Sequence, residues 1–467
     1  MTRGHAYSFT FIIKYLIYMS NNKKILIAIL ACLALIIVFI VMSLNAGKDN
    51  KQTNAWSGGI KVWILEDDAT KFYNYLTKFK ELNQSYKNLQ FSVESFDSYE
   101  DYSMALSHAI IKWEAPDIFM LNNSEKTTMF DKQTLGFLPE IINPNDFRRK
   151  YKWAIANDLI STAEYQGKNI EYLKGVPVGY ETLWVFHNRR YVKTTDVSTF
   201  STLNKVISKY NKDKPEIIPI ALWNGSTVEK AEDIITQFLI AEDGVTGVST
   251  LTSSNIKEPL AQYYIFGDTT WKNAYNNQKD TLNLMGQNNL DLFSKWKTFM
   301  VVGYPRMIQK IAEKGYSKTF LLASTFPQYY SGNQKLSMNY NYFVVNKDSQ
   351  NTQAAQDILN FMTTDIGAEE YLKEFPYYFP ALLSLEEDAL ERKIHKDFNV
   401  VLNDFYNSEA ELISFDKGII MEFNKNIIPV LDNSTNYLNA FEWFLWNIKC
   451  KTKKIINLEG LSTSCGK

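Results

Sequence analysis

Strand-like and helix-like patterns alternate near the start of the globular part of the chain. Residues 60–65 and 118–121 are largely apolar and residues 89–96 alternate, as buried and half-buried strands do. Between them, residues 69–82 and 99–113 carry apolar side chains at helical spacing. This alternation predicts βαβ units and a mainly parallel sheet. Right-handed crossovers then bring the loops after the first and third strands to the same edge of that sheet.

A second informative segment contains a turn, a carboxylate and a strand. Gly175 and Pro177 mark the turn. Residues 183–186 (LWVF) form the continuous apolar run that is typical of a strand covered on both faces. Glu181 lies between the turn and this run, where we expect the chain to enter a sheet.

The N-terminal part contains a long apolar segment. Residues 25–44 form a run of 20 residues in which Ser43 is the only polar member. About 20 apolar residues cross the ~30 Å hydrocarbon core of a bilayer. Lys23 and Lys24 precede the run, which predicts that the N-terminus lies inside and the bulk of the chain outside. The run therefore predicts a single transmembrane helix.

With such an anchor, residues 1–24 are expected to be cytoplasmic, with Met19 as an alternative start, and residues 45–59 form a polar linker. The run is longer than the roughly 7–15 apolar residues of an ordinary signal peptide. Its length favours an uncleaved anchor over the two alternatives, a cleaved signal and a lipoprotein attached at Cys32. All three place the folded part outside the cytoplasm.

Composition argues against several functional classes. At 467 residues the chain is long enough for two domains. A net charge of −1 without a basic tract gives no reason to expect a nucleic-acid partner. The four histidines show no metal-ligand spacing, and no nucleophile, phosphate-loop or CxxC motif occurs. We therefore expect no enzyme, no cofactor and no metal site.

Two cysteines, Cys450 and Cys465, lie close together near the C-terminus. Outside the cytoplasm such a pair can form a disulfide, for which the loop-entropy argument gives about 3 kcal/mol of stabilisation. Two free thiols are the alternative, and the sequence leaves both open.

Three acidic residues, Glu66, Asp67 and Asp68, follow the first predicted strand. Their carboxylates can recognise the hydroxyls of a sugar or bind a cation. The alternative is structural, because acidic residues stabilise the first turn of a helix through its dipole.

A series of short motifs follows in a fixed order over about residues 60–383. The motifs are residues 116–119 (PDIF) with the polar loop 121–124, then 135–139, 177–188, 200–210, 231–244, 299–304, 326–328 and 341–364. This order resembles the extracellular solute-binding proteins of ABC importers, in particular family 1, the carbohydrate-binding, maltose-binding-protein-like members. Lys297 departs from the family pattern because it lacks the expected neighbouring glycine, and residues 384–467 match nothing specific.

The resemblance implies an α/β fold with two lobes, a periplasmic-binding-protein-like architecture of type II that holds its ligand between the lobes. Three segments are expected to cross between the lobes, near residues 177–180, 326–328 and 375–380. The expected segments are 60–178 and 326–375 for lobe 1, and 179–325 and 376–467 for lobe 2.

The same resemblance implies a ligand site at the ends of the strands. Glu181 and Tyr304 are expected on opposite sides of one cleft, and Gly303 is expected to leave room for a sugar beside the Tyr304 ring. For every aromatic residue, packing in the core is the alternative. The expected ligand-binding residues are Glu66, Asp67, Asn122, Asn123, Tyr180, Glu181, Trp223, Asn224, Tyr304, Tyr340 and Asn341.

The implied function is the capture of a small-molecule ligand, a carbohydrate, for the permease subunits of an ABC importer. The protein is expected to act as a monomer that residues 25–44 tether to the membrane. Amino acids, peptides and polyols stay open as ligands. A two-lobed ligand sensor or a surface adhesin without a transport partner is the alternative, and neighbouring permease genes would distinguish the two.

Overall fold

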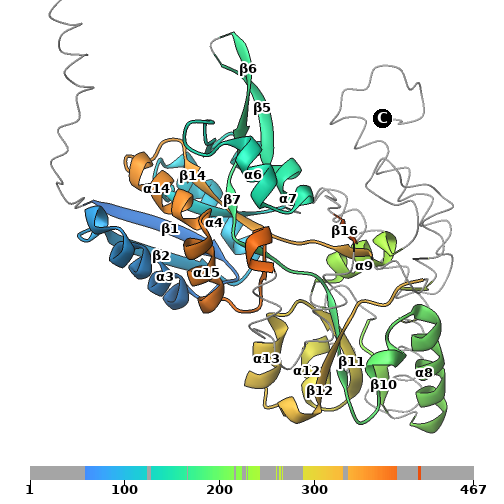
Figure 1. Ribbon diagram of the computed structural model, residues 1–467. Coiled ribbons are helices and arrows are strands. Elements are labelled where there is room, and N and C mark those ends of the chain that lie inside the picture. The colour runs from blue at the N-terminus through green and yellow to red at the C-terminus, as the bar shows by residue number, and fades with distance from the viewer. Residues whose placement is uncertain are drawn as a thin grey trace, which may run out of the picture. The chain divides into compact units, whose positions relative to one another are not determined.

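The computed structural model describes most of the region after the predicted linker, and within it the chain forms two main β-sheets covered by helices (Figure 1). The described residues are 58–386 and 409–411, except 124–127, 166, 215–216, 223–227, 229, 242–287 and 330–334. Within 242–287, the four residues 259, 262, 263 and 266 are also described. Across this part of the chain, no helix is both long and apolar enough to span a membrane. The predicted anchor and the cysteines Cys450 and Cys465 lie outside it.

The first sheet defines lobe 1. Its strands are β1 (Gly59–Leu65), β2 (Gln90–Phe96), β3 (Ile118–Asn122), β4 (Thr134–Leu135), β7 (Val176–Pro177) and β14 (Asn341–Asn346). The strand order is β2-β1-β3-β14-β4, and β7 pairs with β14. A Cβ atom at Gly175 would lie 2.7 Å from the carbonyl oxygen of Phe343. Only glycine therefore allows the chain before β7 to approach β14 so closely.

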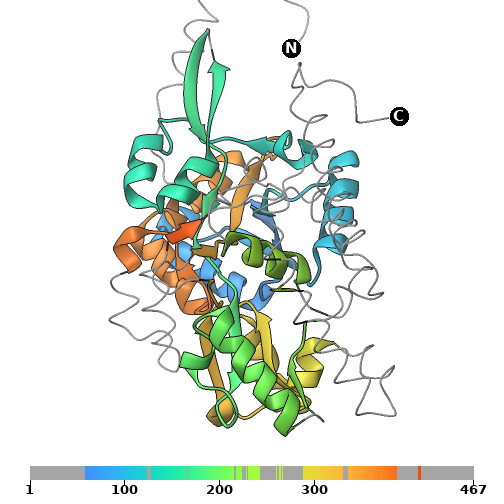
Figure 2. The same ribbon diagram turned by 90° about the vertical axis from the view of Figure 1, so that its right-hand side faces the viewer.

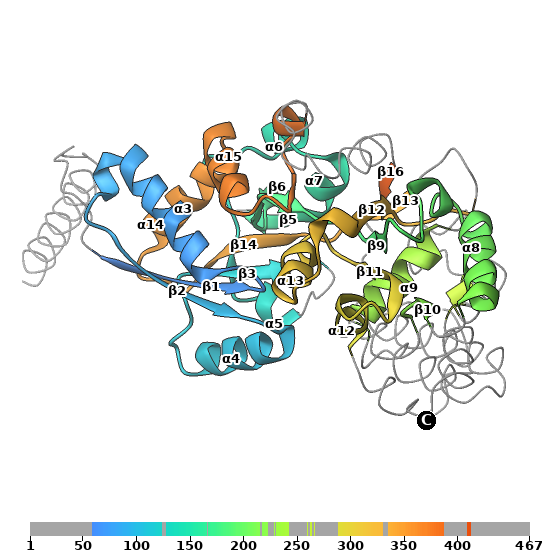
Figure 3. The same cartoon turned by 90° about the horizontal axis from the view of Figure 1, so that it is seen from below.

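Helices cover both faces of this sheet, with α3 and α4 on opposite faces (Figure 3). Helix α3 spans the 69–82 expected from the sequence, whereas α4 ends before residue 113, and Trp113 has a left-handed φ of 61°. A β-hairpin, β5 with β6, stands away from the sheet (Figures 1 and 2). These elements are α3 (Ala69–Leu82), α4 (Tyr99–Ile111), α5 (Thr128–Asp131), α6 (Pro144–Lys150), α7 (Trp153–Leu159), β5 (Ile160–Tyr165), β6 (Lys168–Leu173), α14 (Thr352–Met362) and α15 (Asp365–Glu374).

Aromatic side chains fill the core between α3, β14 and α15. The ring of Phe72 stacks on Phe343 with 5.2 Å between centroids, and Tyr75 meets Tyr371 edge to face at 5.5 Å. All four residues are buried. Much of the aromatic content of the chain thus belongs to packing, as the alternative interpretation of the sequence holds.

The second sheet defines lobe 2. Its strands are β9 (Trp184–Asn188), β10 (Ile218–Ile220), β11 (Thr298–Gly303) and β12 (Leu321–Thr325) in the order β10-β11-β9-β12. Every residue of β9 is buried, which agrees with its continuous apolar run. The helices on this side are α8 (Phe200–Asp213), α9 (Ala231–Ile240), α12 (Asn289–Ser294) and α13 (Met307–Glu313). Short 3₁₀ turns occur at Gln84–Tyr86, Thr194–Asp196 and Lys318–Phe320.

The sheets contain more antiparallel strand pairs than the mainly parallel sheet that the sequence pattern predicts. The pairs β1–β2, β1–β3 and β10–β11 are parallel, but β14 is antiparallel to its neighbours and β9 is antiparallel to β11 and β12. Strand β14 returns from lobe 2, and β9 enters its sheet from lobe 1. No helical crossover inside one sheet joins these strands to their neighbours, so nothing requires a parallel pairing.

The segments that connect the lobes pair with one another. Strand β8 (Gly179–Tyr180) pairs with β15 (Phe379–Pro380). Next to it, Glu181 and Asn339 exchange two backbone hydrogen bonds, at 2.7 and 2.9 Å. Beyond β12, Phe326 packs on Phe238 of α9. The lobe boundaries given above stay a prediction. The remaining short strands, which pair with each other, are β13 (Lys335–Ser337) and β16 (Glu409–Glu411).

Candidate functional site

One arginine connects lobe 2 with lobe 1 and with the crossing segment. Arg306 follows β11 and lies directly before α13. Its Nη1 donates a hydrogen bond of 2.5 Å to Oε2 of Glu66, the residue after β1, and its Nη2 lies 2.5 Å from Oε2 of Glu181. The arginine therefore neutralises two carboxylates that come from different parts of the fold.

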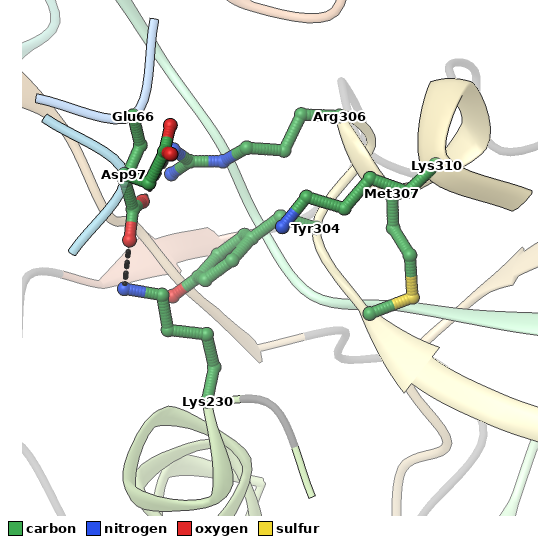
Figure 4. A pocket seen from close by; sticks show the side chains of 7 residues that line it. All are labelled: Glu66, Asp97, Lys230, Tyr304, Arg306, Met307 and Lys310. Carbon is green, nitrogen blue, oxygen red and sulfur yellow. Dashed lines mark hydrogen bonds and ion pairs between the residues drawn. The ribbon is translucent and has the colours of Figure 1, made fainter. Parts of the chain in front are cut away.

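A lysine makes a second connection to the same carboxylate. Lys230, directly before α9, places its Nζ 2.8 Å from Oε1 of Glu66. Both oxygens of Glu66 are thus paired with cations from lobe 2. Figure 4 shows Lys230 and Arg306 approaching Glu66 from different elements.

Burial and charge shift the pKa values of these carboxyl groups in opposite directions. Burial alone would raise the pKa of Glu66, but Arg306 and Lys230 outweigh it and lower that pKa to about 2. Burial raises the pKa of Glu181 to about 7, because Arg306 opposes it only in part and Asp67 adds to the rise. Oε1 of Glu181 is buried without a hydrogen-bond partner among the described residues. Near neutral pH this carboxyl group can accept or donate a hydrogen bond.

A pocket of about 150 Å³ lies beside these ion pairs. At roughly 30 Å³ for each molecule, this is the space of about five waters, and it is below the ~300–1,000 Å³ of sites for drug-sized ligands. Three of the residues in these ion pairs, Glu66, Lys230 and Arg306, line the pocket. The pocket is lined by Glu66, Asp97, Lys230, Tyr304, Arg306, Met307 and Lys310 (Figure 4).

Tyr304 contributes its ring to this pocket. Its hydroxyl donates a hydrogen bond of 2.9 Å to Asp233, and the Arg306 guanidinium lies 5.6 Å from the ring centroid. A Cβ atom at Gly303 would collide with the side chain of Met307. The flexible end of the Met307 side chain occupies the space beside Gly303 here, and room for a sugar at this glycine stays a prediction.

Asp67 and Asp68 have different partners, although they are neighbours. The carboxylate of Asp67 is buried and accepts hydrogen bonds from the hydroxyls of Tyr371, Tyr377 and Tyr378 at 2.9, 2.8 and 3.1 Å. Burial raises its pKa against the influence of Arg306 and the three hydroxyls. Asp68 instead caps α3, since its Oδ1 accepts from two backbone N–H groups of the first turn. For Asp68 the structural alternative is correct.

A cluster of asparagines joins the end of β3 to the segment that returns from lobe 2. Nδ2 of Asn122 donates to Oδ1 of Asn339 at 2.9 Å and to Oδ1 of Asn341 at 2.7 Å. Oδ1 of Asn123 accepts from the backbone N–H of Tyr340 at 3.0 Å. Three of the expected site residues thus meet at one edge of the first sheet. Because β1 and β3 are parallel neighbours, Glu66 follows a strand that ends at this same edge.

The hydroxyls of two expected tyrosines have partners outside this cluster, and two other expected residues lie outside the described part. The hydroxyl of Tyr180 donates to Glu386 at 3.3 Å, and that of Tyr340 donates to Asp158. Trp223 and Asn224 belong to the residues that the structure does not describe. Among the described residues, no group of His, Cys, Asp and Glu side chains is arranged to hold a metal ion.

Sequence reasoning missed the two cations, Arg306 and Lys230. Each lies directly before the first residue of a helix, where the helix dipole disfavours a positive charge. A cation at such a position needs an anion nearby. A basic residue directly before a helix was therefore the signal that the sequence offered. Glu66 is that anion for both.

Comparisons with known proteins agree with this architecture. A search of curated proteins finds no match. An ABC substrate-binding protein from Listeria monocytogenes, solved with cycloalternan, is 15% identical with a TM-score of 0.64, and the match covers 86% of this chain and 100% of that one. The sugar-binding protein MalE of Xanthomonas citri is 13% identical with a TM-score of 0.63, over 86% and 100% of the two chains. At these identities the likeness shows the fold, a two-lobed α/β architecture.

The sequence profile of a family described as bacterial extracellular solute-binding protein matches residues 74–398. This match spans well over half of the chain and includes the second sheet, the segments that connect the lobes and all strands of the first sheet except β1. The chain belongs to the bacterial extracellular solute-binding protein family.

Proposed function

We propose that this protein captures a carbohydrate between its two lobes and delivers it to the permease of an ABC importer. The extracellular family and the fold support this function. Relatives of the same fold were solved with cycloalternan, with α-D-tagatose, with maltose and with D-mannitol, all of them rich in hydroxyl groups. The single observation that carries the proposal is Oε1 of Glu181, a buried carboxyl oxygen without a hydrogen-bond partner among the described residues. The other oxygen of this carboxyl group pairs with Arg306, which lines the interlobe pocket.

Sugar binding suits the chemistry around this oxygen. A carboxylate accepts hydrogen bonds from two adjacent hydroxyls, and such charge-assisted bonds contribute roughly 1.5–3 kcal/mol each. The ring of Tyr304 lines the pocket beside Arg306 and offers an apolar face for the C–H side of a sugar ring. Asn122, Asn123 and Asn341 add amide groups at the neighbouring sheet edge. We propose Glu181 and Tyr304 as the main ligand contacts.

Membrane attachment is part of the proposal. The 20-residue apolar run at 25–44 and the lysines before it support a single transmembrane anchor with the folded part outside. Protease treatment of intact cells should then remove the folded part. Recovery of a soluble mature form that begins near residue 46 would contradict the anchor.

A thermal-shift screen tests the ligand class. The soluble part, residues 55–467, would be mixed with mono- and oligosaccharides, polyols, amino acids and peptides. A ligand at 100 times its dissociation constant should raise the free energy of unfolding by about 2.7 kcal/mol. Stabilisation by sugars and not by amino acids supports the proposal. Stabilisation by amino acids or peptides alone would overturn it.

A further inference from the structure

Four charged side chains form a bridge between the lobes. Arg306 and Lys230 come from lobe 2, Glu66 follows β1 of lobe 1, and Glu181 lies in the crossing segment. The three ion pairs measure 2.5 Å for Arg306–Glu66, 2.5 Å for Arg306–Glu181 and 2.8 Å for Lys230–Glu66. We call this set of four residues the cross-lobe clamp.

Both partners in one of these ion pairs have an unusual backbone. Glu66 has a φ of 59° and Lys230 a φ of 58°, in the left-handed region that residues other than glycine rarely adopt. The backbone N–H of Glu66 donates a hydrogen bond of 2.8 Å to the carbonyl of Phe96 in lobe 1, which holds this conformation in place. Such a backbone is unfavourable and persists only where the surrounding structure imposes it. Its presence at both partners therefore indicates that the fold holds Glu66 and Lys230 in contact.

The clamp is also largely removed from water. The side chain of Arg306 is 12% exposed, that of Glu66 18% and that of Glu181 1%. Partly buried ion pairs are screened less by salt and are stronger than exposed ones. Separating the lobes would pull Arg306 and Lys230 away from Glu66, so the clamp opposes opening.

We propose that the cross-lobe clamp stabilises the closed arrangement of the two lobes before any ligand binds. Glu66 is the lobe 1 end of the clamp, and the two cations of lobe 2 compete with the ligand for the same space. Glu181 is covered while the clamp is closed, so a ligand reaches it only after the clamp opens. This inference depends on the two-lobed fold and not on the chemical identity of the ligand.

The distance between the lobes in the unliganded protein tests the clamp. The full-length chain in detergent micelles would carry a donor dye on α3 at Asn74 and an acceptor dye on α8 at Ser208, both exposed positions. Keto amino acids introduced at these two positions would hold the dyes, because the three native cysteines would also react with thiol labels. Single-molecule energy transfer then gives the ratio of closed to open molecules.

Two variants remove the clamp in different ways. Glu66→Gln removes the lobe 1 charge, and Lys230→Asn removes one cation while placing a residue that tolerates positive φ. Loss of a charge-assisted bond should lower the ratio of closed to open molecules by about tenfold in each variant. Glu171→Gln is the matched control, because it removes the 2.5 Å pair with Arg148 inside lobe 1, and it should leave the ratio unchanged.

An unchanged ratio in Lys230→Asn, with a native circular dichroism spectrum, would overturn the inference. If Glu66→Gln does not fold, Lys230→Asn alone tests the inference. A similar shift in the Glu171→Gln control would also overturn it, since the effect would then not belong to the clamp. No ligand is added, so failure of the clamp leaves the carbohydrate proposal intact, and a failed sugar screen leaves the clamp intact.

Discussion

The aromatic core of lobe 1 and the cross-lobe clamp both bury large side chains, but they do so by different physics. In the core, Phe72 and Tyr75 pack against apolar neighbours, and the stabilisation grows with the area removed from water. In the clamp, Arg306 and Glu181 are buried charges, and each tolerates burial only because the other is present. The core therefore raises the free energy of unfolding, whereas the clamp makes the arrangement of the two lobes depend on what binds between them.

Removing a core ring should have the largest effect. Phe72→Ala leaves a cavity in a tightly packed site and should lower the free energy of unfolding by about 3–5 kcal/mol. Tyr73→Ala is the matched control, because Tyr73 is 44% exposed on the same helix and should change the value by less than about 0.5 kcal/mol. Urea unfolding of both variants gives the comparison. Equal losses would show that the core of lobe 1 is not where the structure puts it.

A buried histidine in lobe 2 should make stability depend on pH. Nε2 of His187 lies 2.9 Å from the hydroxyl of Ser324, and burial lowers the pKa of His187 from 6.5 to about 4. The unfolded chain therefore binds a proton more readily between pH 4 and 6.5. Stability from this group should rise by about 3 kcal/mol across that window and stay constant above it.

The variant His187→Gln isolates this contribution, because Glu181, with its raised pKa, acts with the opposite sign between pH 4.5 and 7. Wild type and variant would be unfolded in urea at several pH values. The free energy of unfolding of the wild type minus that of the variant should rise by about 3 kcal/mol as the pH increases from 4 to 6.5. A constant difference from pH 4 to 7 would mean that His187 titrates normally in the folded protein.

The two neighbouring aspartates should differ in the cost of their removal. Asp67→Ala leaves three tyrosine hydroxyls, two of them on buried residues, without their acceptor and should cost about 2–3 kcal/mol of unfolding free energy. Asp68→Ala removes only the cap of α3 and should cost about 1 kcal/mol. Thermal or urea unfolding of both variants measures the two losses in unfolding free energy. A larger loss for Asp68→Ala would reverse the interpretation of this acidic cluster.

Removing the charge of Glu181 should weaken ligand binding. Glu181→Gln weakens the acceptor for the sugar hydroxyls, and Tyr304→Ala removes a ring from the pocket, so each should weaken ligand binding by about tenfold. Calorimetric titration with the sugar found in the screen measures this. At pH 5, where Glu181 is largely protonated, the gap between wild type and Glu181→Gln should narrow. Unchanged affinity in both variants would remove these residues from the site and leave the family assignment intact.

Local patterns in the sequence predicted the elements of lobe 1 because each element depends on its own residues. Helix α3 has the expected bounds, 69–82, since its apolar spacing and the cap at Asp68 are both local. The clamp could not be found in this way. Glu66 and Arg306 are 240 positions apart, and no periodicity connects a residue after one strand with a residue before a distant helix. The sequence pointed to Glu66 and Glu181 as carboxylates of interest, but not to the cations that bind them.

Hydrogen exchange of the protein with and without a bound sugar tests the central claim most directly. If the ligand lies between the lobes, saturation should slow exchange both in the loop around residues 64–68 and in the loop around residues 302–308. The β5–β6 hairpin, which stands away from the sheets, should exchange at the same rate in both samples and serves as the internal control. Protection on one lobe only, or none at saturation, would contradict capture between the lobes.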